Sequence, residues 1–265
     1  MKLLIYSIAF TFLLCGSPSR IHGQKARTKS LLHFVEANGL RTHYRTWGTR
    51  GTPVVLLHGL YDTASVWNRL APLLASNHRV FAFDRRGMGR SDKPVNGYDH
   101  QTLSQDMAAF IEKQQLGSVI LIGHSFGGEV ALTCAAKHPQ LIRALVLLEG
   151  GFFPKREADV NAQPMPCKAT RAECERFAAL EKAVRAYDAE ALYGAVNAPV
   201  LLVSGAPPAS VSEAMLKEFQ QHLSNVAEKK LKNGQMAIIK NAGHWIQNDQ
   251  PRELAKVIAG FVKWN

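Results

Sequence analysis

Short apolar runs recur along the chain, and each is closed by a glycine or a charged residue. In order they are PVVLLHG (53–59), RVFAFD (79–84), SVILIG (118–123), RALVLLEG (143–150), PVLLVSG (199–205) and QMAIIK (235–240). Because the runs are almost continuously apolar rather than alternating, they predict strands that are covered on both faces, as in a parallel sheet. The stretches between them predict helices at 65–75, 102–115, 127–138, 211–224 and 251–262. This alternation indicates an α/β fold.

The segment 31–47 precedes the first of these runs and predicts two antiparallel strands. Asn38-Gly39 stands between them, and this dipeptide favours the tight turn of a hairpin. Together the runs predict a mostly parallel, eight-stranded sheet with helices on both faces. With 265 residues, of which 46% are hydrophobic, the chain can build one sizeable core. We therefore expect a single domain over residues 24–265.

One interval interrupts the alternation, because residues 151–198 separate two strands by far more chain than a crossover needs. Its second part places apolar residues at helical spacing and predicts one amphipathic helix. These residues are Phe177, Leu180, Val184 and Tyr187. The apolar face must rest on something, and we expect a short helical lid over the C-terminal edge of the sheet. A surface helix without that role is the alternative.

The first 23 residues have the layout of a secretory signal peptide. Lys2 precedes the apolar run LLIYSIAFTFLLCG, and small or polar residues follow as far as Gly23. The run is too short for a comfortable membrane span, so we expect no stable span after cleavage. A secreted or periplasmic protein follows from this interpretation. Lipoprotein anchoring at Cys15 is the alternative, and the bulky Leu14 before it argues against it.

The chain is basic, with a formal net charge of +11. Removing the leader lowers this to about +9, which is still enough to favour anionic surfaces weakly. The lysines and arginines are scattered without long blocks, so a solvated surface explains them better than a nucleic-acid partner.

An oxidising compartment would permit a disulfide between Cys167 and Cys174, and free thiols at both positions are the alternative. Cys134 is expected to be a buried thiol.

The stretch SVILIGHSFGGEVAL (118–132) carries a G-x-S-x-G motif centred on Ser125. An apolar strand precedes the motif and a helical stretch follows it, which is the context in which the motif predicts a nucleophilic serine. Holding Ser125 at the tip of a tight turn requires Gly123 and Gly127, because side chains there would collide with the neighbouring chain. The helix behind the serine would direct backbone N–H groups at negative charge forming on a substrate.

GHSFGG (123–128), preceded by LLHGL (56–60) and FDRRGMGRSDKP (83–94), resembles the α/β-hydrolase superfamily. The resemblance covers essentially all of residues 30–265 and implies the α/β-hydrolase fold. In that family the backbone N–H groups of Leu60 and Phe126 would form the oxyanion hole. The resemblance also implies that His58 and His124 position other groups and that the turn after Asp84 is structural.

The resemblance implies His244 as the catalytic base. It follows Ala242 and Gly243 after the last predicted strand and precedes the final helix, in a glycine-histidine context that matching families share. Serine needs such a proton acceptor because its hydroxyl is a poor nucleophile unaided.

The triad acid is missing from its usual place. In most relatives an aspartate stands three residues after a glycine at the end of the seventh strand, but Pro208 occupies that slot after Gly205. Glu149 ends the preceding strand, and some relatives place their acid there, so it is the expected substitute. Glu213 is the rival acid, and Asp159 is a more distant third.

These residues predict an exported serine hydrolase that cleaves ester-type acyl bonds of a small, mainly apolar substrate through an acyl-enzyme. The sequence carries no metal-ligand cluster and no dinucleotide motif, so neither a metal nor a cofactor is implied. In this family dehalogenases and epoxide hydrolases use an aspartate nucleophile, which Ser125 argues against. A carbon–carbon bond hydrolase, a perhydrolase and a non-catalytic, receptor-like member remain alternatives. The substrate-binding residues and the oligomeric state stay unknown.

Overall fold

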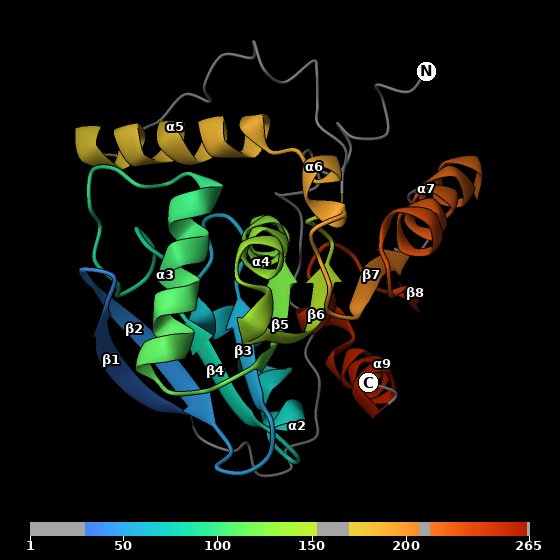
Figure 1. Ribbon diagram of the computed structural model, residues 1–265, viewed down its shortest axis with the longest axis horizontal. Coiled ribbons are helices and arrows are strands. Elements are labelled where there is room, and N and C mark those ends of the chain that lie inside the picture. The colour runs from blue at the N-terminus through green and yellow to red at the C-terminus, as the bar shows by residue number, and fades with distance from the viewer. Residues whose placement is uncertain (1–29, 153–169, 207–212, 264–265) are drawn as a thin grey trace.

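The computed structural model describes residues 30–152, 170–206 and 213–263, with side chains in the last range from 217 to 262. Eight strands form one sheet in the order β1-β2-β4-β3-β5-β6-β7-β8 (Figure 1). The strands are β1 (Leu31–Ala37), β2 (Leu40–Trp47), β3 (Pro53–Leu57), β4 (Arg79–Phe83), β5 (Val119–His124), β6 (Ile142–Leu148), β7 (Val200–Ala206) and β8 (Gly234–Lys240). Among the strand pairs of the described residues, β1–β2 and β2–β4 are antiparallel and the other five are parallel. The predicted α/β fold with a mostly parallel, eight-stranded sheet is confirmed.

Helices fill the connections between the strands. They are η2 (Ala64–Asn68), α2 (Ala71–Leu74), α3 (His100–Lys113), α4 (Phe126–Lys137), η3 (Pro139–Leu141), α5 (Arg171–Ala186), α6 (Glu190–Tyr193), α7 (Glu213–Asn225), η5 (Val226–Lys230), α8 (Ile246–Asp249) and α9 (Pro251–Lys263). Four of the five predicted helices are found close to their expected bounds. The predicted helix at 65–75 is instead broken into η2 and α2. Pro72 explains the break, because it has no N–H with which to continue the hydrogen bonding of η2.

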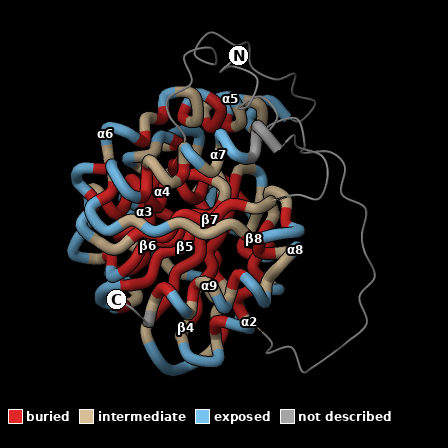
Figure 2. The backbone as a smooth tube through the Cα atoms, turned by 90° about the vertical axis from the view of Figure 1, so that its right-hand side faces the viewer, coloured by how far each residue is buried: buried red, intermediate tan, exposed pale blue. Residues whose placement is uncertain are grey.

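Both faces of the sheet are covered, as the continuous apolar runs predicted. In β3, Val55 and Leu57 pack with α3 and α4, while Val54 and Leu56 pack on the other side with η2, α2 and α9. All four side chains are at most 1% exposed. Figure 2 shows the buried strands between exposed outer segments. The alternation of strand residues between two apolar layers holds the sheet at the centre of the molecule.

The C-terminal ends of the parallel strands share one edge of the sheet, and α5 lies on that side (Figure 1). Thr170 and Glu173 form a capping box that starts α5. Leu180 on its inner face is fully buried, and Phe177 packs edge-on against Tyr61 with ring centroids 4.9 Å apart. Because Tyr61 follows β3, this contact seats the helix over the loops at the C-terminal edge.

Some predictions concern residues beyond the described ranges. The leader 1–23, Cys15, Asp159 and Cys167 all lie outside them. Cys174 is disulfide-bonded, whereas Cys134 is free and buried. In the ranges the structure describes, no helix combines the length and apolar character required to cross a membrane.

Candidate active site

Ser125 stands at a sharp turn between β5 and α4. Its φ of 53° lies in the left-handed region that non-glycine residues rarely adopt, so the turn is strained. The Ser125 N–H donates to the Leu148 carbonyl at 2.8 Å, and the Ser125 carbonyl accepts from Gly128 N–H at 2.7 Å. A Cβ atom on Gly123 would lie 2.7 Å from the Gly127 carbonyl carbon, which is closer than real contacts allow. The sequence therefore builds the strand-turn-helix elbow that the motif predicted.

The next strand brings Glu149 toward this serine. A Cβ atom on Gly150 would lie 2.6 Å from Ser125 Cα, so only glycine permits such a close approach of the two backbones. Glu149 itself has a φ of 51°, a second left-handed residue at the same edge of the sheet. Two strained positions side by side at the ends of β5 and β6 are typical of a functional site.

The carboxylate of Glu149 is held by β7. Its Oε1 accepts hydrogen bonds from the Ser204 hydroxyl at 2.6 Å and from Gly205 N–H at 2.5 Å. Its Oε2 faces His244 Nδ1 at 4.0 Å. This distance is within ion-pair range but too long for a hydrogen bond. Thus the end of β7, where the usual aspartate is missing, supplies the donors that orient a glutamate from β6.

His244 lies in the loop between β8 and α8, where the sequence predicted it. A Cβ atom on Gly205 would lie 2.8 Å from the Gly243 carbonyl oxygen, so the end of β7 packs closely against this loop. The His124 Nε2–H donates to the His244 carbonyl at 2.7 Å, and the two imidazole rings are 4.7 Å apart. Because His124 directly precedes Ser125, this hydrogen bond ties the His244 loop to the elbow.

His124 is a neutral tether. Burial lowers its pKa to about 3, with a further contribution from the nearby His244. A neutral imidazole has one N–H, and the carbonyl acceptor requires that proton on Nε2. Within the described residues, Nδ1 of His124 has no hydrogen-bond partner. These contacts agree with a positioning role rather than a catalytic one.

The loop His58-Gly59-Leu60 passes directly beside the serine. A Cβ atom on Gly59 would lie 3.2 Å from Ser125 Cβ and 3.1 Å from His124 Nδ1. His58 is fully buried, and burial lowers its pKa well below the usual value. Its Nδ1 donates to the Gly59 carbonyl at 2.9 Å, while Nε2 accepts from the Arg85 N–H at 3.1 Å. The neutral imidazole therefore stiffens the loop that carries Leu60.

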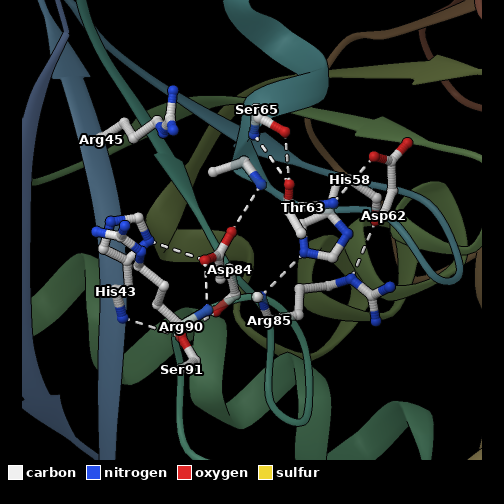
Figure 3. Close-up of polar contacts among 12 residues, drawn as sticks. His43, Arg45, His58, Asp62, Thr63, Ser65, Asp84, Arg85, Arg90 and Ser91 are labelled. Carbon is white, nitrogen blue, oxygen red and sulfur yellow. Dashed lines mark hydrogen bonds and ion pairs between the residues drawn. The ribbon is translucent and has the colours of Figure 1, made fainter.

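Arg85 was not identified by sequence analysis. Its guanidinium donates to the His58 carbonyl at 3.0 Å (Figure 3). It also donates to the Gly59 carbonyl at 2.7 Å. Its central carbon stacks 4.7 Å above the centre of the Phe126 ring. The signal in the sequence was only an arginine directly after a buried strand, inside a turn that we interpreted as structural.

Asp84 does have the structural contacts expected of that turn. Its carboxylate accepts from His43 Nδ1 at 2.8 Å, from Ala64 N–H at 2.7 Å and from Arg90 N–H at 2.9 Å (Figure 3). One side chain thus joins β2, η2 and the turn after β4.

Asp62 is a second carboxylate that sequence analysis did not select. It accepts a hydrogen bond from Trp245 and lies near Arg85 and His244. Burial raises its pKa, against the opposing effect of those neighbours. Asp62 therefore links the loop after β3 to the loop that carries His244. The sequence offered no spacing that would have paired residues so far apart.

The structure brings Ser125, Glu149 and His244 to one edge of the sheet, where Phe126 follows the serine and the loop that carries Leu60 passes beside it. Within the described residues the Ser125 hydroxyl has no hydrogen-bond partner. Glu213 is the first residue of α7, but its side chain lies outside the described set. The described part of the chain has no cluster of three His, Cys, Asp or Glu residues that could hold a metal ion.

A family model described as the alpha/beta hydrolase fold matches residues 52–173, the part that includes the elbow. Epoxide hydrolase 3 of Xenopus tropicalis is 26% identical over 92% of this chain and 79% of its own length. Together these matches support the α/β-hydrolase superfamily, as the resemblance of the motifs implied.

Two further comparisons describe proteins that this chain is similar to. The soluble epoxide hydrolase of a Corynebacterium strain is 38% identical, but the match spans only 44% of this chain and 41% of that protein. The crystal structure of E-2-(acetamidomethylene)succinate hydrolase superposes with a TM-score of 0.70 at 24% identity, covering 89% of this chain and 100% of the other. These comparisons support a hydrolase as the enzyme class.

Proposed function

We propose that this α/β-hydrolase is an exported serine hydrolase that cleaves ester-type acyl bonds through a Ser125–His244–Glu149 triad. One observation carries the proposal. Glu149 directs one carboxylate oxygen at His244 Nδ1, while β7 holds the other oxygen, at the edge of the sheet where the elbow presents Ser125. An anchored carboxylate behind an imidazole is the arrangement that makes a serine nucleophilic.

The reaction proceeds in two steps, acylation of the serine and hydrolysis of the acyl-enzyme. Ser125 Oγ forms a bond to the ester carbonyl carbon as its proton passes to His244 Nε2. The tetrahedral intermediate collapses, the bond from carbon to the alkoxide oxygen breaks, and the imidazolium returns its proton to the leaving alcohol. Water then attacks the acyl-enzyme by the same route and releases the acid. Glu149 stabilises the imidazolium formed in both halves.

The negative oxygen of the intermediate requires donors, and Leu60 and Phe126 supply them in this proposal. Phe126 is the first residue of α4, so its N–H is unused within the helix and lies at the positive end of the helix dipole. Leu60 follows Gly59, which lies beside Ser125 Cβ, so the Gly59–Leu60 peptide is next to the serine. Such preorganised donors act most strongly where water is excluded.

An acyl substrate fits a serine better than an epoxide does, although two relatives are named epoxide hydrolases. Opening of an epoxide by Ser125 would form an ether. An ether has no carbonyl for water to attack, so the enzyme could not turn over. An ester instead leaves an acyl group on the serine, which water can remove.

We infer a mainly apolar acyl group for the substrate. Tyr61 is 37% exposed and contacts Phe177 of α5, and Leu60 is half-buried beside them. This surface of aromatic and aliphatic side chains lies over the C-terminal edge of the sheet, and α5 acts there as a lid. Export through residues 1–23 and a small-molecule substrate without a cofactor or nucleic acid complete the proposal.

The test is hydrolysis of p-nitrophenyl esters with acyl chains of two to twelve carbons, together with labelling by a fluorophosphonate. We expect turnover and labelling that both disappear in Ser125→Ala and persist in Ser76→Ala, a matched surface variant. A wild-type protein that folds but gives neither signal would contradict the proposal and favour a receptor-like protein. Labelling without ester turnover would direct the search to carbon–carbon bond hydrolysis or perhydrolysis.

A further inference from the structure

Arg85 occupies a buried position between the two halves of the proposed oxyanion hole. The residue is 1% exposed. Its Nε and one terminal nitrogen donate to the carbonyls of His58 and Gly59, and its backbone N–H donates to the His58 imidazole. On its other side the guanidinium packs over the ring of Phe126. One side chain thus contacts both segments that carry the proposed donors.

The contacts of Arg85 with the Gly59 carbonyl also fix the direction of the Leu60 N–H. The Gly59 carbonyl and the Leu60 N–H belong to one planar peptide unit, and the chain has no cis peptide in its described residues. In a trans peptide the C=O and N–H point in opposite directions. Because Arg85 and His58 hold the Gly59 oxygen on one side, the Leu60 N–H is fixed on the opposite side.

We propose that Arg85 is a positioning residue that orients and polarises the Gly59–Leu60 peptide so that the Leu60 N–H stabilises the oxyanion. This inference rests on the proposed ester hydrolysis. A cationic donor on the carbonyl draws electron density from the peptide and makes its N–H a stronger donor. The effect is larger in a buried site than in water.

The electrostatic surroundings favour this role over simple packing. Burial lowers the pKa of Arg85 to about 9, and the carboxylates of Asp62 and Glu129 oppose that shift, so the guanidinium is charged at neutral pH. Within the described residues its remaining terminal nitrogen is buried without a hydrogen-bond partner. An aliphatic side chain would fill the space without burying a charge. The cation is therefore best explained by the carbonyls that it contacts.

The experiment compares Arg85→Met and Arg85→Lys with the wild-type enzyme. We expect Arg85→Met to lower kcat about 100-fold, in the range of losing one oxyanion donor, with KM changed less than threefold. Binding of an alkyl trifluoromethyl ketone, which forms a tetrahedral oxyanion on serine, should weaken by a similar factor. Arg85→Lys should recover part of both losses because an ammonium can still donate to the Gly59 carbonyl.

Arg79→Met is the matched control. Arg79 also donates to a glycine carbonyl, that of Gly51, but it is only partly buried and belongs to the opposite end of β4. The Arg79→Met variant should have the kcat, KM and ketone affinity of the wild type. A merely structural role for Arg85 would lower the melting temperature of Arg85→Met while leaving kcat and ketone binding unchanged. That result, or a rise in KM alone, would overturn the inference.

A crystal structure of Arg85→Met separates this inference from the proposed function. We expect the Gly59–Leu60 peptide to rotate or to adopt several orientations in that structure. An unchanged peptide would overturn the inference, even if the wild-type protein proved inactive on esters. If Arg85→Met does not fold, the structure and kinetics of Arg85→Lys decide in its place. A lysine there that no longer contacts the Gly59 carbonyl, combined with wild-type peptide geometry and wild-type kcat, would overturn the inference.

Discussion

Glu149 Oε2 lies 4.0 Å from His244 Nδ1, while Glu149 Oε1 is fixed by two donors from the end of β7. The two oxygens therefore have separate tasks. One anchors the side chain to the neighbouring strand, and the other remains directed at the imidazole. We expect Nδ1 to come within hydrogen-bond distance when a substrate is bound, because catalytic hydrogen bonds often tighten only in the complex.

Replacing the acid is the sharpest test of this arrangement. Glu149→Gln should lower kcat about 10²- to 10⁴-fold, because an amide cannot stabilise the imidazolium or select its tautomer as a carboxylate does. Steady-state kinetics on a p-nitrophenyl ester measure the loss. Glu213→Gln is the control and should retain wild-type turnover. The opposite pair of results would assign the acid to Glu213.

Ser204 should affect kcat because its hydroxyl anchors the carboxylate of Glu149. Ser204→Ala removes a hydroxyl that donates to the carboxylate, leaving the Gly205 N–H as the remaining anchor. We expect kcat to fall about 10- to 100-fold, the size of one charge-assisted hydrogen bond. The double variant with Glu149→Gln should lose little beyond Glu149→Gln alone. Additive losses in the double variant would show that Ser204 acts independently of Glu149.

The aromatic contact between Tyr61 and Phe177 should control the preference for acyl length. Phe177→Ala removes a ring that packs over the loop after β3, so KM for long-chain esters should rise about 5- to 10-fold through lost apolar contact. KM for an acetyl ester and kcat for both esters should change less than twofold. Phe34→Ala is the control, since that exposed ring lies on β1 at the far edge of the sheet. Equal changes for short and long esters would contradict a lid role for α5.

Stability should depend on pH through the buried histidines. The pKa of His124 is lowered to about 3 and that of His58 is lowered well below 6.5, so the unfolded chain binds more protons than the folded protein as the pH falls below 6.5. The free energy of unfolding should therefore be level above pH 6.5 and fall by about 1.4 kcal/mol per pH unit for each histidine below it.

Urea unfolding between pH 7.5 and 4.5 measures this slope. His124→Gln should reduce the slope by about 1.4 kcal/mol per pH unit, because it removes one of the two groups. His78→Gln, at a half-buried turn position, serves as the control and should keep the wild-type slope. A slope unchanged in His124→Gln would mean that His124 is not the neutral tether described.

The close approach of Gly150 to Ser125 predicts a large cost for one added methyl group. Gly150→Ala would place Cβ 2.6 Å from Ser125 Cα, so the free energy of unfolding should fall by about 3 kcal/mol or more, with activity lost as the elbow shifts. Gly194→Ala is the control, because its Cβ would meet no atom within 4 Å. That variant should keep activity and gain up to about 1 kcal/mol from reduced freedom of the unfolded chain. Chemical denaturation of both variants tests the contrast.

Much of the fold was readable from the sequence because it depends on local patterns. Continuous apolar runs predicted buried parallel strands, Asn38-Gly39 predicted the hairpin turn, and the glycines around Ser125 predicted the elbow. The predicted helix at 65–75 was the exception, since its apolar spacing concealed the break at Pro72. In each correct case neighbouring residues carry the information, through side-chain period or backbone freedom.

The site depended on contacts between segments far apart in the chain, and these only the tertiary structure decided. The sequence selected Glu149 by its unusual place at the end of a strand. The pairing of β6 with β7 is what supplies the Ser204 and Gly205 donors, and the packing of the last loop on β7 is what brings His244 to it. Arg85 and Asp62 were not found because no short-range period relates them to the groups they contact. Sequence patterns record which face of an element is buried, whereas the partners of a buried charge are fixed only when the sheet and its loops have assembled.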